Sequence, residues 1–458
     1  MLLRFSVQNF LSFKDQMEFS MMAGRVKRHK NHTILCQDKK VLKGAYIFGA
    51  NASGKSNFVK AIKMAETIAV GGLDSVSLDK KNFRIDPSYR NKPGVFQFDI
   101  FSNGRFYSYG LALSYNQNSI LEEWLYQIGD EEKCIFWRKF DEDKNEFSVE
   151  SDLEENDETG RFLIYREDFR SQKMNRKTFL SDVYYRSPDE DSFYQPFRDM
   201  MQWFEHLCII FPYSKYGGIT QLVDDTNEKT RLETLLQYFD TGILSISKNT
   251  VDLEKDTNIP QNVIEVIKSK LIKPMSLNSD LRGVVQSQEA RYEFQEENGT
   301  IRGYELLSDH GNPDDLFRYS DESDGTQRLF DLIPIYQTAL QNAVILVDEI
   351  DRSLHTKAVQ EFIKYYYELT ANNFSQLIVT THDSNILDLD LVRQDEIWFV
   401  ERLSDKSSNL YSLNRYNARF DKKIEKDYLI GRYGAIPVFR QIERFRKVSI
   451  SEEDEDLC

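Results

Sequence analysis

The chain has 458 residues, of which 40% are hydrophobic and 13% aromatic. It can therefore bury a substantial core and is not a disordered polyelectrolyte. Its 59 basic and 74 acidic residues give a formal net charge of −15. This charge excludes a surface that is basic overall and binds nucleic acid throughout, but it is compatible with a local basic patch. The four cysteines form no C-x-x-C pair, which argues against a zinc site or a disulfide framework.

Hydrophobic stretches in this sequence are short. None approaches the ~18 residues of a membrane span. The opening residues alternate and carry polar side chains, unlike a signal peptide. We therefore expect a cytoplasmic protein with no membrane partner.

The first third of the chain predicts strands and one helix. Alternating apolar residues indicate a strand within 2–13 and another over 43–48, and helical spacing of apolar residues follows from about residue 55. Two β-rich runs on either side of Asn103-Gly104 predict a hairpin, because this dipeptide favours a tight turn between strands. A third β-rich run over 134–140 continues the predicted sheet.

The rest of the chain changes character twice. Residues 161–273 have mostly helical periodicity, including a helix that Pro260 is expected to open. A second hairpin is predicted around Asn298-Gly299. Beyond it, helices alternate with apolar strands over 343–347 and 376–381, which indicates a parallel sheet.

These elements predict an α/β fold, a mixed sheet with flanking helices, split by a mainly helical insertion. The expected divisions are an N-terminal lobe over 1–140, the insertion over 141–290, a C-terminal lobe over 291–440 and an acidic tail over 441–458. The tail contains five consecutive acidic residues and is interpreted as a solvating end.

Residues 49–56 match the pattern G-x-x-x-x-G-K-[ST] between a predicted strand and a predicted helix. Glycines let backbone N–H groups surround a phosphate and the helix N-terminus adds its dipole, so the pattern predicts nucleotide binding rather than an ordinary glycine-rich turn. Lys55 is expected to reach the β- and γ-phosphates, and the Ser56 hydroxyl to ligate Mg²⁺. The predicted ATP-binding residues of this P-loop are Gly49, Asn51, Ala52, Ser53, Gly54, Lys55, Ser56 and Asn57.

Acidic and imidazole groups follow the two apolar strands of the C-terminal part. Asp348 and Glu349 end the first strand, where parallel sheets bind ligands, although a plain strand end meeting solvent is the simpler interpretation. With a P-loop upstream, Asp348 is expected to hold Mg²⁺, directly or through water, and Glu349 to polarise the attacking water. His382 follows the next strand and is expected at the same edge, hydrogen-bonding the γ-phosphate.

The order of these motifs resembles the ABC-class ATPases, and within them the SMC-like and RecF-like branch, where a helical arm splits the nucleotide-binding domain. The sequence is most similar to the AAA-labelled ATPases of bacterial abortive-infection systems, such as the AbiL and PARIS ATPase subunits. The segments that carry this likeness are 7–13, 322–328, 348–355 and 431–437. The resemblance implies an ABC-type P-loop ATPase domain with ATP and Mg²⁺ as cofactors.

The resemblance also implies a composite site, in which two domains sandwich two ATPs and the signature loop of one caps the γ-phosphate held by the other. The residues implied to bind ATP in trans are Ser323, Gly325, Thr326 and Gln327. Asp324 falls where the usual signature serine would be, and a carboxylate beside a phosphate is unfavourable. Either Ser323 supplies the hydroxyl from a shifted register, or Asp324 turns away to cap its own helix. The sequence assigns no glutamine to the Q-loop; Gln127, near the predicted hairpin strands, is a candidate and no more.

The resulting hypothesis is a switch ATPase of an anti-phage system, with Lys55, Glu349 and His382 as its catalytic residues. The expected partners are a second copy of the chain, a separately encoded effector nuclease and a phage trigger protein. The alternatives are a RecF-like ATPase acting directly on DNA and a scaffold that binds ATP without hydrolysing it. The basic cluster at 25–30 is interpreted as a solvated loop near the nucleotide, or else as a nucleic-acid contact. Too few residues follow Asp388-Leu389-Asp390 for a built-in nuclease domain.

Overall fold

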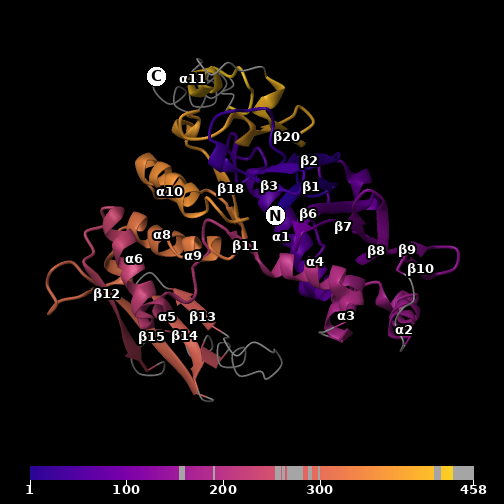
Figure 1. Cartoon of the computed structure of the whole chain (residues 1–458), viewed down its shortest axis with the longest axis horizontal. Helices are drawn as coiled ribbons and strands as arrows, with labels where there is room; N and C mark the ends of the chain where they lie inside the picture. Colours follow the sequence, from indigo (N-terminus) through magenta and orange to yellow (C-terminus); the bar gives the residue numbers. More distant parts are fainter. Residues whose placement is uncertain are drawn as a thin grey trace, which may run out of the picture.

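The computed structural model describes residues 1–153, 160–188, 191–252, 259, 264–265, 282–286, 291–297, 300–416 and 424–436. These residues form three large sheets and a small two-stranded one (Figure 1). The first large sheet is antiparallel, with strand order β10-β9-β8-β7-β6-β1-β2. Its strands are β1 (Leu2–Gln8), β2 (Met17–Ser20), β6 (Gly94–Ser102), β7 (Arg105–Ser114), β8 (Ser119–Ile128), β9 (Glu132–Asp141) and β10 (Glu146–Glu150).

The hairpin predicted around Asn103-Gly104 is confirmed. Asn103 has φ 47° and Gly104 has φ 78°, the left-handed pair of angles that suits the twist of two antiparallel strands. Strand β8, which the sequence analysis did not predict, lies between this hairpin and the predicted run at 134–140. Its pattern mixes charged and apolar residues, so alternation does not mark it clearly.

The second large sheet has the order β11-β17-β18-β5-β19-β20 and is parallel except for β20. Its strands are β5 (Gly44–Phe48), β11 (Leu207–Ile210), β17 (Val344–Val347), β18 (Gln376–Thr381), β19 (Ile397–Arg402) and β20 (Ser408–Ser412). Strands β5, β17 and β18 are buried along their whole length, as expected for parallel strands covered on both faces. The α/β fold predicted from the sequence, a mixed sheet with flanking helices, is confirmed.

Two hydrophobic cores lie on opposite faces of this parallel sheet. Val344 and Leu346 of β17 belong to the core that includes α1 (Lys55–Gly71) and the antiparallel sheet. Ile345 and Val347, which point the other way, belong to the core on the other face. The helices of that second core are α8 (Asp324–Leu332), α9 (Ile335–Ala339) and α10 (Thr356–Leu369).

The stretch 141–290, expected to be mainly helical, is mixed. The helices described within it include α2 (Arg161–Asp168), α3 (Phe179–Arg186), α4 (Gln195–Glu205), α5 (Ile219–Asp224) and α6 (Thr226–Tyr238). Within this stretch the chain also returns to the parallel sheet, because β11 pairs with β17. A four-residue apolar run such as β11 cannot be distinguished from part of a helix by periodicity, which explains why it was not predicted.

The third large sheet is antiparallel and crosses the expected boundary at residue 290. Its strands are β12 (Ser245–Val251), β13 (Arg282–Gln286), β14 (Arg291–Glu297), β15 (Thr300–Asp309) and β16 (Phe317–Arg318). The second predicted hairpin is present as the pair β14 and β15. Most of the helix expected from Pro260 and all of the acidic tail lie outside the described residues.

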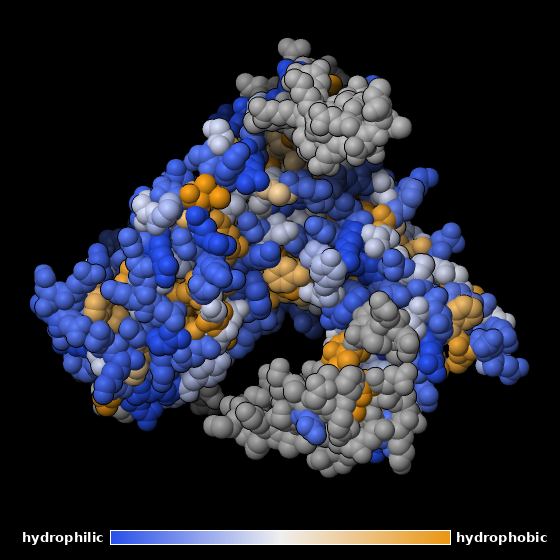
Figure 2. Space-filling model, turned by 180° about the vertical axis from the view of Figure 1, so that it is seen from behind, coloured by the Kyte–Doolittle hydropathy of each residue, from blue (hydrophilic) through white to orange (hydrophobic). Residues whose placement is uncertain are grey.

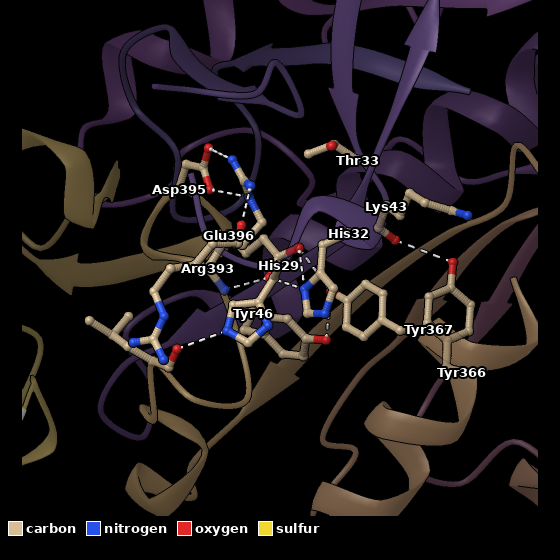
Figure 3. A network of polar contacts seen from close by, with 12 residues as sticks. His29, His32, Thr33, Lys43, Tyr46, Tyr366, Tyr367, Arg393, Asp395 and Glu396 are labelled. Carbon is tan, nitrogen blue, oxygen red and sulfur yellow. Dashed lines mark hydrogen bonds and ion pairs between the residues drawn. The ribbon is translucent and has the colours of Figure 1, made fainter. Parts of the chain in front are cut away.

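A buried polar network lies at the amino ends of β5 and β19 (Figure 3). His32 Nδ1 is 3.1 Å from the carboxyl oxygens of Glu396, which also accept hydrogen bonds from the Tyr367 hydroxyl at 3.0 Å and the Arg393 backbone N–H at 2.7 Å. Burial raises the pKa of Glu396 well above its usual range and lowers the pKa of His32 to about 3. Both directions favour neutral groups, so a carboxylic acid donating to imidazole fits this buried site.

The basic cluster at 25–30 is held at this end of the sheet. Arg28 Nη2 lies 2.5 Å from Asp390 Oδ1, and the Arg28 carbonyl accepts a hydrogen bond from Arg393 Nη1 at 2.8 Å. None of the cluster residues lines the nucleotide pocket described below. The expectation that this loop lies near the nucleotide is therefore wrong.

The surface of the molecule is mainly hydrophilic when seen from behind, with hydrophobic residues in small separate groups (Figure 2). Over the described ranges, no helix is long and apolar enough to cross a membrane.

An ion pair buried in the N-terminal half joins α3 to the antiparallel sheet. Glu123 on β8 lies 2.9 Å from Arg138 Nε on β9, and neither side chain has any exposed surface. The Glu123 carboxylate also accepts the backbone N–H groups of Phe179 and Leu180, at 2.7 and 3.1 Å. The pair therefore fixes the first turn of α3.

Glu123→Gln should destabilise the fold by leaving the Arg138 charge buried without compensation. Breaking a buried pair from one side costs about 3–5 kcal/mol, so we expect the free energy of unfolding in urea to fall by about that amount. Glu167→Gln is the control, because its partner Arg170 is exposed and the pair is expected to add nothing measurable. Equal stability of Glu123→Gln and wild type would contradict this role for the pair.

Candidate nucleotide-binding site

Parallel pairing brings the predicted motifs to one edge of the sheet. The P-loop follows β5, His382 follows β18, and Asp348 and Glu349 follow β17. Because β18 pairs in parallel with both β5 and β17, the carboxyl ends of all three strands meet at this edge. The sequence positions are far apart, yet the side chains lie within contact of one another.

The P-loop requires both of its glycines. Gly54 has φ 118°, and a Cβ there would lie 2.2 Å from Ser408 Oγ on β20. A Cβ at Gly49 would lie 2.5 Å from the Val400 carbonyl oxygen of β19. The loop therefore packs so tightly against β19 and β20 that only glycine fits. Helix α1 begins directly after Gly54, at Lys55, with its free N–H groups at the loop.

Lys55 lies inside this loop and is 4% exposed. Its Nζ donates to the carbonyl oxygens of Gly49 and Ala50, at 2.8 and 3.2 Å, and lies 3.2 Å from His382 Nδ1. Burial lowers the pKa of Lys55 to about 8, while nearby acids, Asp348 first among them, oppose the shift. The side chain is therefore still mainly a cation at neutral pH and is placed to meet a phosphate.

Ser56 and Asp348 supply the oxygen ligands expected for Mg²⁺. The Ser56 hydroxyl donates to Asp348 Oδ1 at 3.2 Å, and the Thr380 hydroxyl donates to the same oxygen at 2.6 Å. Hydroxyl and carboxylate oxygens side by side fit Mg²⁺, which takes one or two protein ligands and completes its shell with phosphate oxygens and water. Thr380 was not predicted, although it directly precedes Thr381-His382 at the end of β18.

Glu349 and His382 face each other across the same edge. Glu349 Oε1 lies 3.8 Å from His382 Nε2, and the Glu349 N–H donates to the Thr380 hydroxyl at 2.9 Å. The His382 backbone N–H lies 3.2 Å from Asp351 Oδ2. Burial and then the Lys55 ammonium lower the pKa of His382. A neutral imidazole that accepts from Lys55 on Nδ1 carries its proton on Nε2, the atom that faces Glu349.

Lys55, Ser56, Glu349 and His382 line a cavity of about 680 Å³, whereas Asp348 is buried and is not part of its lining. Besides predicted residues, the cavity is lined by residues that the sequence analysis did not identify: Leu11, Ser12, Lys80, Asn82, Phe83, Arg84, Ile85, Arg402 and Lys406. They come from the turn after β1, the segment between α1 and β6, and the β19–β20 hairpin. Leu11 and Ser12 belong to the segment 7–13 that carries the family likeness, but no local motif marks the others, because only the tertiary fold brings these three segments together.

The signature residues lie elsewhere. Ser323, Gly325, Thr326 and Gln327 do not line this cavity, and of the predicted P-loop residues Gly49 does not line it either. The Ser323 hydroxyl accepts the Thr326 N–H at 3.2 Å and so caps α8, which makes the idea that Asp324 caps this helix wrong. A Cβ at Gly325 would lie 2.9 Å from the Ser353 carbonyl oxygen, so α8 begins against the segment that follows Glu349.

Gln127 is not close to the nucleotide pocket. It lies on β8, opposite Tyr107 and Lys133, and borders a separate cavity. The structure thus gives no support to Gln127 as a Q-loop residue.

A known protein family matches the part of the chain that contains this site. The family model described as "AAA domain, putative AbiEii toxin, Type IV TA system" matches residues 45–388, a range that includes the P-loop, the acidic pair and His382. The chain belongs to this family. No curated protein matches the sequence.

Several solved SMC head structures are similar to the chain. The SMC head bound to the C-winged helix domain of ScpA has a TM-score of 0.39 at 14% identity, covering 91% of this chain and 99% of that one. The SMC head domain from Thermotoga maritima has a TM-score of 0.34 at 12% identity, covering 90% and 98%. The Smc head domain with an extended coiled coil, bound to the C-terminal domain of ScpA derived from Pyrococcus furiosus, has a TM-score of 0.36 at 14% identity, covering 94% and 98%.

Lys55→Ala should abolish tight ATP binding, because it removes the one buried cation of the loop. Charge-assisted hydrogen bonds contribute about 1.5–3 kcal/mol, so a titration with a fluorescent ATP analogue should show affinity lower by at least about tenfold. Lys60→Ala, an exposed change on the same helix, is the control and should bind like wild type. Normal binding by Lys55→Ala would refute the assignment of this loop.

Proposed function

We propose that this protein is an ATP-hydrolysing ABC-class switch ATPase of a bacterial anti-phage system, which responds to infection and controls a separately encoded effector nuclease. The observation that supports hydrolysis best is the meeting of Lys55, Asp348, Glu349 and His382 at one sheet edge. The family, whose description names a toxin of a type IV toxin–antitoxin system, supports the defence setting.

Each group of the chain has a distinct task in this proposal. The P-loop N–H groups and Lys55 bind the β- and γ-phosphates, with Ser56 and Asp348 placed to hold Mg²⁺, which neutralises phosphate charge. Glu349 orients a water molecule and takes its proton as the water oxygen attacks the γ-phosphorus. The bond from that phosphorus to the β,γ-bridging oxygen breaks, and ADP leaves with the electron pair. His382, with its proton on Nε2, is placed to donate to the γ-phosphate.

The position of the signature supports an ATP-bridged dimer. Residues 323–327 do not line the pocket of their own chain, yet they form a helix start, exposed at Ser323 and Asp324, of the kind that binds anions. We propose that they face the γ-phosphate held by a second copy. ATP then makes contacts that only the closed dimer provides, so it favours that state by differential affinity.

Glu349→Gln should separate binding from turnover. The amide keeps the shape but cannot accept the proton, so ATP hydrolysis should fall by about 10²–10⁴-fold while ATP affinity persists. Trapped ATP should then shift the protein towards the dimer, which light-scattering mass would detect. Glu368→Gln, exposed on α10, is the matched control. Unchanged turnover in Glu349→Gln would exclude it as the base.

The defence role is testable in cells that carry the gene with its neighbours. Phage plaque counts should fall with the wild-type gene and recover with Lys55→Ala or Glu349→Gln, and a nuclease should co-purify with the wild-type protein. Restriction that survives both changes would contradict a switch driven by ATP. Salt-sensitive DNA binding by the ATP-loaded protein alone, without effect on phage, would favour the alternative of direct action on DNA.

A further inference from the structure

The start of α8 carries an exposed carboxylate that its own chain does not use. Asp324 is the first residue of the helix, and Ser323 provides the cap. The Asp324 side chain is exposed, and it does not line the nucleotide cavity. In a dimer that brings this helix start to a triphosphate, a carboxylate facing only phosphate is repelled. A cation opposite Asp324 would convert this repulsion into attraction.

Exposed cations border the nucleotide cavity. This cationic rim consists of Lys80, Arg84, Arg402 and Lys406. Among the described residues, Arg84, Arg402 and Lys406 form no ion pair, whereas Lys80 lies 3.9 Å from Asp79 in a pair exposed on both sides. The P-loop and Lys55 already provide the phosphate contacts, so the rim holds positive charge beyond what the loop itself requires.

The rim and Asp324 do not meet within one chain. Arg402 and Lys406 belong to the β19–β20 hairpin, and Figure 1 shows β20 well separated from α8. The cavity lining likewise contains the rim but no residue of 323–327. Contact between the two therefore requires a second copy of the chain.

Net charge favours such a contact. Each copy carries a formal charge of −15, so two copies repel each other at long range. Local charge complementarity in a closed dimer offsets part of this repulsion. In a two-fold dimer one complementary pair occurs twice, because the same patch of each subunit meets the other.

We propose that Asp324 of one subunit forms an ion pair with the rim arginines, Arg84 and Arg402, of a second copy. Arginine presents a planar fork that suits a carboxylate, which favours these two over the rim lysines. The contact places the partner's signature helix over the nucleotide and makes closure sensitive to the charge of residue 324. This inference rests on the proposed function, because it presupposes an ATP-bridged dimer.

The test is a charge swap in the Glu349→Gln background, where ATP is trapped. Asp324→Arg places like charge against the rim and should raise the ATP-dependent dimer dissociation constant by at least about tenfold. Adding Arg84→Glu or Arg402→Glu should restore dimerisation with at least one of the two. Asp324→Asn keeps the helix start uncharged and should weaken the dimer less, with a loss that shrinks as salt rises. Sedimentation equilibrium with and without ATP provides the measurement.

Asp315→Arg is the matched control, because it makes the same charge change at an exposed position of the same lobe. If the Glu349→Gln parent does not dimerise with ATP, the proposed function fails. If the parent dimerises and Asp324→Arg dimerises equally well, or if neither swap restores the dimer, only the ion pair is overturned. Thermal melting of each variant shows whether a loss of dimer reflects a loss of fold.

Discussion

The site depends on one constraint, the parallel pairing of β18 with β5 on one side and β17 on the other. This pairing aligns the carboxyl ends of three strands that are distant in the chain. It places Ser56, Asp348 and Thr380 in one hydrogen-bonded group. A shift of one strand by one residue would exchange the side chains that face the two cores and would displace the residues that follow the strand at the carboxyl edge. The two hydrophobic cores, one on each face of the sheet, therefore fix the geometry of the candidate site as well as the fold.

Much of the site was predictable from the sequence because its key residues belong to local patterns. The P-loop residues, Asp348, Glu349 and His382 each follow a strand or begin a helix. A few consecutive residues therefore show both the functional side chain and its place at the end of an element. Parallel-sheet topology then predicts that they meet. The hairpin at Asn103-Gly104 was predictable for the same reason, because its turn needs left-handed angles that few residues adopt readily.

What was not predictable depends on contacts between distant segments. Strand β11 is short and uniformly apolar, and only its pairing with β17 distinguishes it from a helix in the same stretch. The cationic rim comes from two segments separated by more than three hundred residues, neither of which has a motif. The N-cap of α8 was not predictable either, because Ser323 and Asp324 are adjacent and both residue types favour the N-cap position.

Occupancy of the P-loop and the state of the catalytic groups are physically linked. The Lys55 ammonium divides its hydrogen bonds between two loop carbonyls and His382 Nδ1. Phosphate oxygens are stronger acceptors than either, so a bound triphosphate competes for the same ammonium. The other nitrogen of His382 faces Glu349. A change in the partner of Lys55 therefore alters the electric field at the imidazole and, through it, at the Glu349 carboxylate. The P-loop and Glu349 belong to one chain of contacts, so a triphosphate in the loop cannot leave this carboxylate unaffected.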